Sequence, residues 1–306
     1  MLKMRVKPAL IITLAAALGL YAASGKSGWE QDGLKGKVKT ATQTRTKTGK
    51  KSTETTKFIT KYDASGSRTV KESYDAKGLL SSNEKYKYDD SGNMIEKLKY
   101  KADKSLSSRT VSRYDSNSNR VEEIVYDSKG VFSMKETWRY DAGGNVIEYA
   151  LFETEKSQPL KSVYKYDSKG SMIEETRFSP KGTLFMKITN RYDAEGKLTE
   201  SVEWSAMSVI QKGPVTTKTV HKYDTAGNLI EKTYYKADGS VSMKFVYMYD
   251  ARGNKIEEAL YKSDGALMRK ELYKYDTKGN VIEKIKKSDE VTITEKTTWT
   301  YQYYKK

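Results

Sequence analysis

The sequence contains no cysteine, a single histidine (His221) and only four prolines among 306 residues. Without cysteine, the chain can form neither disulfide bonds nor thiol-based sites, so packing and backbone pairing must stabilise the fold. The sequence also lacks a phosphate-binding glycine loop, a nucleophile elbow and a cluster of metal ligands. We therefore expect no enzymatic activity, no cofactor and no metal site.

Long apolar runs are scarce too, and the clearest one lies near the N-terminus. Lys3, Arg5 and Lys7 precede an apolar segment over residues 9–23. A basic start, a short apolar core and small residues after it are typical of a secretory signal peptide, which we predict over residues 1–24. The alternative is an uncleaved membrane anchor, although a bilayer span needs about 20 residues. We expect an exported protein in the periplasm, at the cell surface or outside the cell, with no membrane span after signal removal.

Acidic residues are the minority charge. The chain has 56 Lys and Arg against 40 Asp and Glu, which gives a formal net charge of +16. A basic exported protein attracts anionic partners, so we consider an anionic polysaccharide, lipopolysaccharide or a surface protein, and we do not expect nucleic acid. Because the lysines are spread along the chain, the alternative is that they serve solubility.

A Tyr-Asp pair recurs from residue 58 onward, with a spacing of 26 residues that rises once to 31. The nine pairs begin at Tyr62, Tyr88, Tyr114, Tyr140, Tyr166, Tyr192, Tyr223, Tyr249 and Tyr275. We number positions from this tyrosine as position 0. Glycine holds position +4 in eight repeats, asparagine +5 in six, glutamate +8 in eight, and lysine or arginine −1 in eight. This regularity predicts a tandem array.

Between the turns, the segments alternate with period two, as strands do. Met134, Trp138 and Tyr140 share one parity, and Lys135 and Arg139 share the other. Asp-x-x-Gly is typical of a tight hairpin turn, in which the carboxylate accepts backbone N–H groups and glycine adopts a positive φ. We assign this structural role to Asp63, Asp89, Asp141, Asp167, Asp224, Asp250, Asp276, Gly92, Gly144, Gly170, Gly227, Gly253 and Gly279.

A second, weaker turn lies inside each repeat, as at residues 126–130, and it makes every repeat a hairpin. We predict an all-β fold of tandem antiparallel β-hairpin repeats, with about 18–20 strands in a curled or rolled meander sheet. Residues 25–57 read as a linker plus a degenerate N-terminal hairpin, and residues 58–306 as the array. Whether the sheet closes, spirals or folds into two layers is left open.

The repeat positions also predict the two faces of the sheet. We expect the Tyr, Trp and Ile positions to form an apolar inner face. The cation at −1 and the glutamate at +8 are expected to form cross-strand charge pairs on the outer face, each contributing at most a few tenths of a kcal/mol.

The candidate sites are few. His221 occupies position −2, which other repeats fill with Tyr or Trp, so we interpret it as a substituted aromatic residue. The turn aspartates lack the tandem glycine pattern of calcium-binding repeats. Five extra residues lie near 204–215, and functional contacts of repeat proteins often lie on such insertions. We propose ligand contacts there for Trp204, Met207, Val209 and Ile210; the alternative is that they lengthen a strand and cover an edge.

The motif Tyr-Asp-x-x-Gly-Asn-x-Ile-Glu, as in residues 249–257, resembles the YD repeat of Rhs-type bacterial exported and cell-surface proteins. The resemblance covers about four fifths of the chain. It implies hairpins strung into a curling sheet, which closes as a shell around a toxin in large members, and carbohydrate binding is attributed to such repeats. The 26-residue period is longer than is typical of the family, and nine repeats are too few for a shell.

Together these features predict an exported, non-enzymatic YD-repeat protein that binds anionic or carbohydrate surface polymers or has a structural role. One alternative is a component of a polymorphic-toxin or secretion system that serves as a shell or carrier. A second alternative is an outer-membrane β-barrel. Charges on both strand parities, such as Lys232, Lys244 and Glu257, count against a lipid-facing wall.

Overall fold

The structure is a computed structural model that describes residues 28–49, 52–206, 213–289 and 291–305. No helix within these ranges is long and apolar enough to cross a membrane. The described chain contains one short helix, α2 (Gly28–Gln31), and twenty β-strands. In chain order the strands are β1 (Val38–Thr48), β2 (Thr53–Tyr62), β3 (Arg68–Tyr74), β4 (Leu80–Tyr88), β5 (Met94–Lys101), β6 (Leu106–Tyr114), β7 (Arg120–Asp127), β8 (Phe132–Tyr140), β9 (Val146–Phe152), β10 (Leu160–Tyr166), β11 (Met172–Phe178), β12 (Leu184–Tyr192), β13 (Leu198–Ser205), β14 (Val215–Tyr223), β15 (Leu229–Tyr235), β16 (Val241–Tyr249), β17 (Lys255–Lys262), β18 (Leu267–Tyr275), β19 (Val281–Lys287) and β20 (Ile293–Tyr303).

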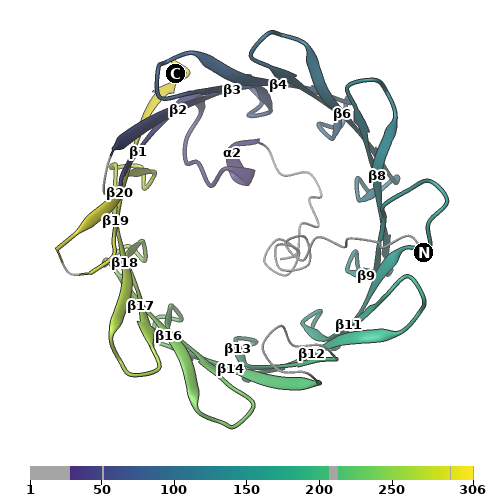
Figure 1. Cartoon of the computed structure of the whole chain (residues 1–306), viewed down its shortest axis with the longest axis vertical. Coiled ribbons are helices and arrows are strands. Elements are labelled where there is room, and N and C mark those ends of the chain that lie inside the picture. Colours follow the sequence, from purple (N-terminus) through teal and green to yellow (C-terminus); the bar gives the residue numbers. More distant parts are fainter. Residues whose placement is uncertain (1–27, 50–51, 207–212, 290, 306) are drawn as a thin grey trace.

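Each strand pairs antiparallel with the next one in sequence, and β1 also pairs with β20. In that last ladder, Ala41 lies opposite Tyr301 and Thr44 lies opposite Thr298. The sheet therefore closes into a barrel, which Figure 1 shows end-on as a ring. The predicted all-β meander of about 18–20 antiparallel strands is confirmed. Because β1 and β20 pair with each other, the sheet is closed and neither spirals nor folds into two layers.

The hairpin turns lie alternately at the two ends of the barrel, as antiparallel pairing requires. We call the end with the Tyr-Asp turns the YD rim and the other end the second rim. In one YD turn, Asp141 Oδ1 accepts the backbone N–H groups of Gly143 and Asn145 at 2.9 and 2.8 Å. Gly144 has φ 81°, a left-handed conformation that glycine adopts at little cost. Both backbone bonds to the aspartate recur at Asp63, Asp89, Asp115, Asp167, Asp250 and Asp276.

The tyrosine at position 0 ties neighbouring strands together. The Tyr166 hydroxyl, at the end of β10, donates to the Val146 carbonyl at the start of β9 at 2.8 Å. Burial raises the pKa of Tyr166 to about 12, so this hydroxyl remains a donor at neutral pH. The same bond to a carbonyl of the preceding strand is made by Tyr88, Tyr114, Tyr140, Tyr192, Tyr223, Tyr249, Tyr275 and Tyr301.

Helix α2 lies inside the ring, beside the strands where the barrel closes (Figure 1). The Trp29 N–H donates to the Gly66 carbonyl at 3.1 Å, and the Trp29 indole N–H donates to the Val38 carbonyl at 2.5 Å. The Asp32 carboxylate, just after the helix, accepts hydrogen bonds from Tyr62 and Arg68. Positions 0 and +6, to which Tyr62 and Arg68 belong, therefore point inward.

The strand register then assigns the other positions, because directly opposed residues share a face. Tyr86 at −2 lies opposite Lys97 at +9, while Lys87 at −1 lies opposite Glu96 at +8. Positions 0, −2, −4, −6, +6, +9 and +11 line what we call the inner wall. Positions −1, −3, −5, +8, +10 and +12 form the outer wall.

Few apolar side chains are fully buried in this barrel. Among the described residues, the buried hydrophobic ones are Val38, Tyr62, Val146, Tyr149, Ala150 and Ala259. A barrel of twenty strands is far wider than the roughly eight-strand barrels whose interiors side chains fill. Stability therefore comes from the hydrogen-bonded ladder and from contacts between neighbouring side chains along each wall.

Candidate binding surface on the barrel walls

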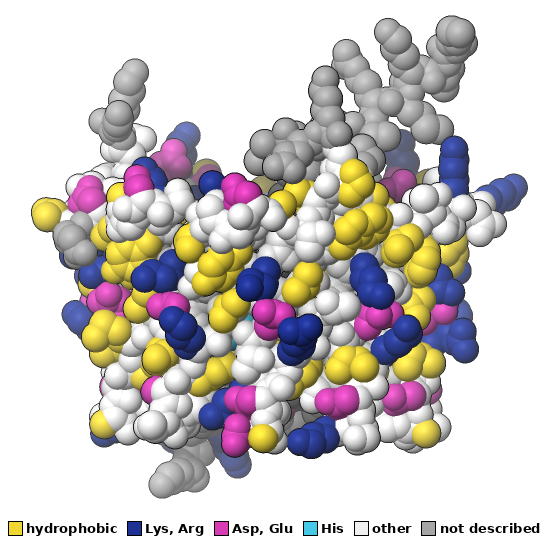
Figure 2. Space-filling model, turned by 90° about the horizontal axis from the view of Figure 1, so that it is seen from below, with side chains coloured by type: hydrophobic (Ala, Val, Ile, Leu, Met, Phe, Trp, Pro, Cys, Tyr) yellow, Lys and Arg dark blue, Asp and Glu magenta, His cyan; other side chains and the backbone are white. Residues whose placement is uncertain are grey.

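The outer wall carries a regular belt of ion pairs. Glu96 at +8 is held between Lys87 at 2.8 Å and Arg109 at 2.6 Å, and hydrogen bonds from these cations lower the pKa of its carboxyl group. The same cation–glutamate–cation arrangement centres on Glu148, Glu174, Glu200, Glu231 and Glu283. Figure 2 shows basic and acidic side chains interspersed on the side of the barrel that faces the viewer. These pairs confirm the predicted cross-strand charge pairing.

Aromatic side chains at +12 form a row on the outer wall toward the second rim. Several lie opposite a lysine in the ladder, and the Lys135 ammonium stands 4.6 Å from the Phe152 ring centroid. The row comprises Tyr74, Tyr100, Tyr126, Phe152, Phe178, Trp204, Tyr235 and Tyr261. Trp204 is partly exposed in β13, opposite Lys187 and Thr216. Met207, Val209 and Ile210 lie outside the described residues, so the proposed contact patch at the insertion stays a prediction.

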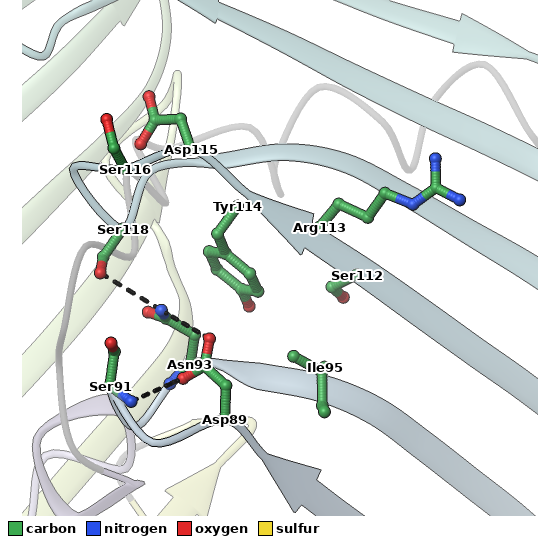
Figure 3. Close-up of a pocket in the computed structure, with 10 residues that line it drawn as sticks. All are labelled: Asp89, Ser91, Asn93, Ile95, Ser112, Arg113, Tyr114, Asp115, Ser116 and Ser118. Carbon is green, nitrogen blue, oxygen red and sulfur yellow. Dashed lines mark hydrogen bonds between the residues drawn. The ribbon is translucent and has the colours of Figure 1, made fainter.

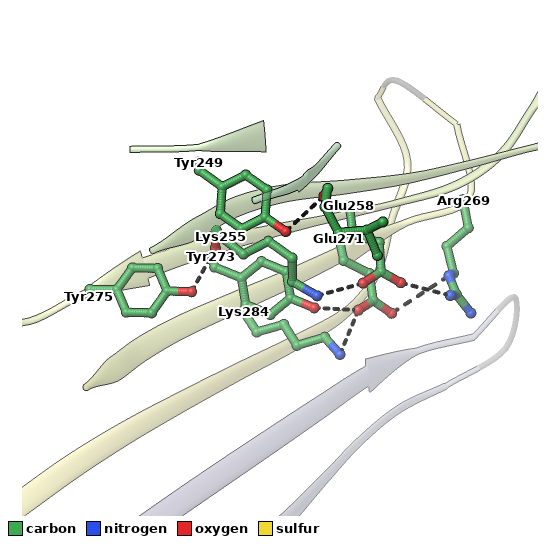
Figure 4. Close-up of polar contacts among 9 residues, drawn as sticks. Tyr249, Lys255, Glu258, Arg269, Glu271, Tyr273, Tyr275 and Lys284 are labelled. Carbon is green, nitrogen blue, oxygen red and sulfur yellow. Dashed lines mark hydrogen bonds and ion pairs between the residues drawn. The ribbon is translucent and has the colours of Figure 1, made fainter. Parts of the chain in front are cut away.

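The Tyr and Trp positions line the inner wall as predicted, but charged side chains lie among them, so the wall is not the apolar face that we expected. In β17–β19, Lys255 pairs with Glu258 at 2.6 Å and Lys284 pairs with Glu271 at 2.7 Å. Arg269 contacts both glutamates, at 3.5 Å from Glu258 and 3.6 Å from Glu271 (Figure 4). Glu271 is only 7% exposed. Charged side chains withdrawn from water need such partners, so the inner wall of β17–β19 is a connected polar cluster.

Cations cover the faces of several inner aromatic residues at −2. The Arg120 guanidinium lies 4.3 Å from the Trp138 ring centroid, and the Lys255 ammonium lies 5.0 Å from that of Tyr273. Both cations come from position +6 of the preceding repeat, and Arg68 has the same relation to Tyr86 at 5.4 Å. The cations hold these rings by cation–π attraction. Each covered ring face is closed to ligand stacking.

Burial changes the protonation of several inner groups. Burial raises the pKa values of Glu136 and Glu203. The Glu136 carboxyl group accepts a hydrogen bond from the Tyr149 hydroxyl at 2.5 Å. Burial, with repulsion from Lys232, lowers the pKa of His221. His221 is therefore neutral at pH 7, and it faces inward in β14 at position −2.

We find no group of three or more His, Cys, Asp or Glu side chains that could hold a metal ion among the described residues. The carboxylates of the turn aspartates accept hydrogen bonds from backbone N–H groups of the same turn. Hydrogen bonds from the Asn254 side chain and backbone lower the pKa of Asp250, for example. The repeated aspartates therefore have a structural role in the turns.

A groove of about 460 Å³ lies at the YD rim, lined in part by the β4–β5 and β6–β7 turns (Figure 3). The Asn93 side-chain amide crosses between the turns and donates to Asp89 at 3.0 Å and to Ser118 at 3.2 Å. Ser118 replaces the usual +4 glycine and keeps the left-handed conformation, with φ 61°. These polar groups hold the two turns together. We therefore interpret the groove as the space between two adjacent turns and not as a ligand site.

Sequence reasoning placed the aromatic and charged positions but missed the polar inner wall. The inner charges occupy positions +6, +9, +11, −4 and −6, and their residue types change from repeat to repeat. Because these residue types vary, a search for residues that recur in every repeat does not detect the inner charges. Their shared strand parity with the −2 aromatic residues is the signal that could have identified them.

Comparisons with known proteins give partial matches. Residues 111–213 match a family described as an uncharacterised protein, and residues 211–259 match a protein of unknown function (DUF2963). No curated protein matches the chain.

Three solved structures share a loose likeness with the barrel. The TcdB2-TccC3 structure is 16% identical with a TM-score of 0.31, over 77% of this chain and 16% of that one. The Photorhabdus luminescens Tc holotoxin pore is 15% identical with a TM-score of 0.31, over 76% and 15%. A porin-like protein from Bacteroides uniformis is 8% identical with a TM-score of 0.39, over 87% and 96%. The chain thus spans about one sixth of the toxin chains, and both matching family models describe uncharacterised proteins.

Proposed function

We propose that this chain is an exported, non-enzymatic YD-repeat protein whose barrel binds an anionic or carbohydrate polymer along its inner wall. The observation that supports this proposal is the chemistry of that wall. Hydrogen-bonding, charged and aromatic side chains line it where a globular protein would place a packed apolar core. Ligand sites combine apolar contact area with a few well-placed polar groups, and this wall supplies both.

The basic balance of the chain supports an anionic polymer in particular. The formal net charge is +16, and a surplus of cations raises the local concentration of anionic ligands. The test is titration calorimetry of the purified chain with polygalacturonate, with dextran as a neutral control, at physiological salt. We expect saturable binding of at least one polymer. Failure of both to bind, or binding that modest salt abolishes, would contradict specific recognition.

The alternative of an outer-membrane barrel is favoured by the closed antiparallel sheet with an even strand number. The outer wall argues against it, because the ion-pair belt around Glu96, Glu174 and Glu283 would face lipid. A lipid-facing lysine or arginine costs about 2–4 kcal/mol at the bilayer midplane. Cell fractionation tests this alternative. We expect the chain in the soluble or salt-washable fraction, and recovery from the outer membrane only with detergent would favour the membrane barrel.

A carrier in a toxin or secretion system is distinguished by what copurifies with the chain. A carrier would retain a specific polypeptide inside the barrel after isolation from its own cells. The polymer-binding proposal expects no stoichiometric polypeptide in mass spectrometry of the purified protein.

A further inference from the structure

The inner wall of β3–β5 carries a cluster of cations that continues from the YD rim into the barrel. Arg68 at +6 lies nearest the rim, and Lys71, Lys97 and Lys99 lie further along the strands. We call these four residues the cationic sector. In the ladder, Glu84 has Lys71 on one side and Lys99 on the other, while Lys97 lies opposite Tyr86. Strands β3–β5 thus contribute four inner cations and one inner carboxylate, Glu84.

The inner wall on the β7–β13 side has the opposite balance. Four glutamates face two arginines there: Glu123, Glu136, Glu175, Glu203, Arg120 and Arg177. An anionic chain inside the barrel is therefore attracted to the cationic sector and repelled from the other side.

The sector already binds a carboxylate of the chain itself. Two guanidinium nitrogens of Arg68 bond to the two oxygens of Asp32, with Nε at 3.2 Å and Nη2 at 2.5 Å. The Tyr62 hydroxyl donates to the same carboxylate. This paired geometry is how arginine recognises carboxylate groups. Asp32 therefore shows what the rim end of the sector can hold.

We propose that the cationic sector binds a carboxylate-bearing polysaccharide, and that Asp32 competes with this ligand for Arg68. The inference rests on the proposed polymer-binding function and specifies its ligand class and site. Lysine ammonium groups are compact charges suited to successive carboxylates along a chain, and Arg68 supplies the one paired contact. Beside the lysines, the partly exposed Ser108 of β6 lies opposite Lys99 and offers a hydroxyl of the kind that hydrogen-bonds sugars.

Two other classes of macromolecule fit the wall less well. A peptide that binds by adding a strand needs a free sheet edge, and here the terminal strands β1 and β20 are paired with each other. Single-stranded nucleic acid is bound by base stacking on aromatic faces, and in this sector Arg68 covers one face of Tyr86.

The test compares two triple variants of the full chain that remove the same charge. One carries Lys71→Gln, Lys97→Gln and Lys99→Gln on the inner wall, and the control carries Lys87→Gln, Lys165→Gln and Lys274→Gln in the outer belt. We expect the inner variant to bind polygalacturonate about tenfold more weakly, and the outer control to change affinity by about twofold or less. Thermal melts and circular dichroism establish that both variants fold.

The variant Asp32→Asn is expected to raise the affinity about threefold, because it frees Arg68 for the ligand. Equal losses in the two triple variants, or an unchanged or lower affinity in Asp32→Asn, would overturn the proposed site while leaving polymer binding intact. Failure of the unaltered chain to bind polygalacturonate while it binds dextran would overturn the ligand class alone. Tighter binding of single-stranded DNA or of polyglutamate would replace the polysaccharide by that class of ligand.

Discussion

The inner and outer walls are built from the same strands, yet they use charge in different ways. On the outer wall, glutamate recurs at +8 in eight of nine repeats, and most of these glutamates sit between two partly exposed cations. On the inner wall, position −4 is glutamate in three repeats, serine or threonine in three, and phenylalanine or isoleucine in three. A regular position serves the architecture shared by all repeats. The irregular positions are not constrained by that shared architecture.

The largest expected difference concerns one glutamate on each wall. We expect Glu271→Ala to lower the free energy of unfolding by about 3–5 kcal/mol, because Lys284, Arg269 and Tyr273 lose a buried partner. The matched outer variant, Glu283→Ala, removes contacts with two partly exposed lysines and should cost about 0–1 kcal/mol. Urea unfolding of both variants measures the difference. Equal costs would mean that the inner charges are hydrated like the outer ones.

The two rims are also expected to differ in their tolerance of substitutions, because α2 packs on a turn of the YD rim. In Gly66→Ala, the new methyl group would meet the Trp29 ring at 2.5 Å, in addition to the strain of φ 92°. Gly78→Ala at the second rim meets nothing within 4 Å and carries only the φ strain. We expect about 1–2 kcal/mol for Gly78→Ala and clearly more for Gly66→Ala by thermal unfolding. Similar melting temperatures would show that α2 can leave the rim at little cost.

A smaller effect separates inner from outer tyrosines. Tyr166→Phe removes the hydroxyl that donates to the Val146 carbonyl and should cost about 1 kcal/mol. Tyr261→Phe in the outer row keeps its ring beside Lys244 and should stay within about 0.5 kcal/mol of the unaltered chain. Chemical denaturation distinguishes the two. A neutral Tyr166→Phe would indicate that water replaces the lost donor.

The pH dependence should have opposite signs on the two walls, with the smallest magnitude of these effects. The pKa of Glu96 is lowered from its usual 4.5, so its stabilisation is present above pH 4.5 and is lost as the pH falls through the folded-state pKa. The pKa of Glu136 is raised, so its stabilisation is present below 4.5 and is lost as the pH rises through the folded-state pKa.

Unfolding free energies of Glu96→Gln and Glu136→Gln, measured against pH, check these signs. Relative to the unaltered chain, Glu96→Gln should recover as the pH falls, and Glu136→Gln should recover as the pH rises above 4.5. Parallel curves would show that both carboxylates meet the same environment.

Local features of the sequence determined most of the fold. The Asp-x-x-Gly turns bond to their own backbone within five residues, as at Asp141, and the period-two segments pair with their sequence neighbours. Such short-range interactions are readable from one sequence because they need no distant partner. The ion pair of Lys87 with Glu96 was predictable for the same reason, since one turn joins the two residues.

Only the tertiary structure decided what depends on distant residues. The pairing of Ala41 with Tyr301 closes the barrel, and closure creates an inside and an outside. It also brings Lys35 to Asn280, across 245 residues, while the packing of α2 on the β2–β3 turn brings Asp32 to Arg68, across 36. Whether twenty strands meet depends on twist summed over the whole sheet, and no local pattern encodes that sum. The sequence by itself determined the hairpin and its repetition, whereas the closed ring turned one face of that hairpin into an enclosed inner wall.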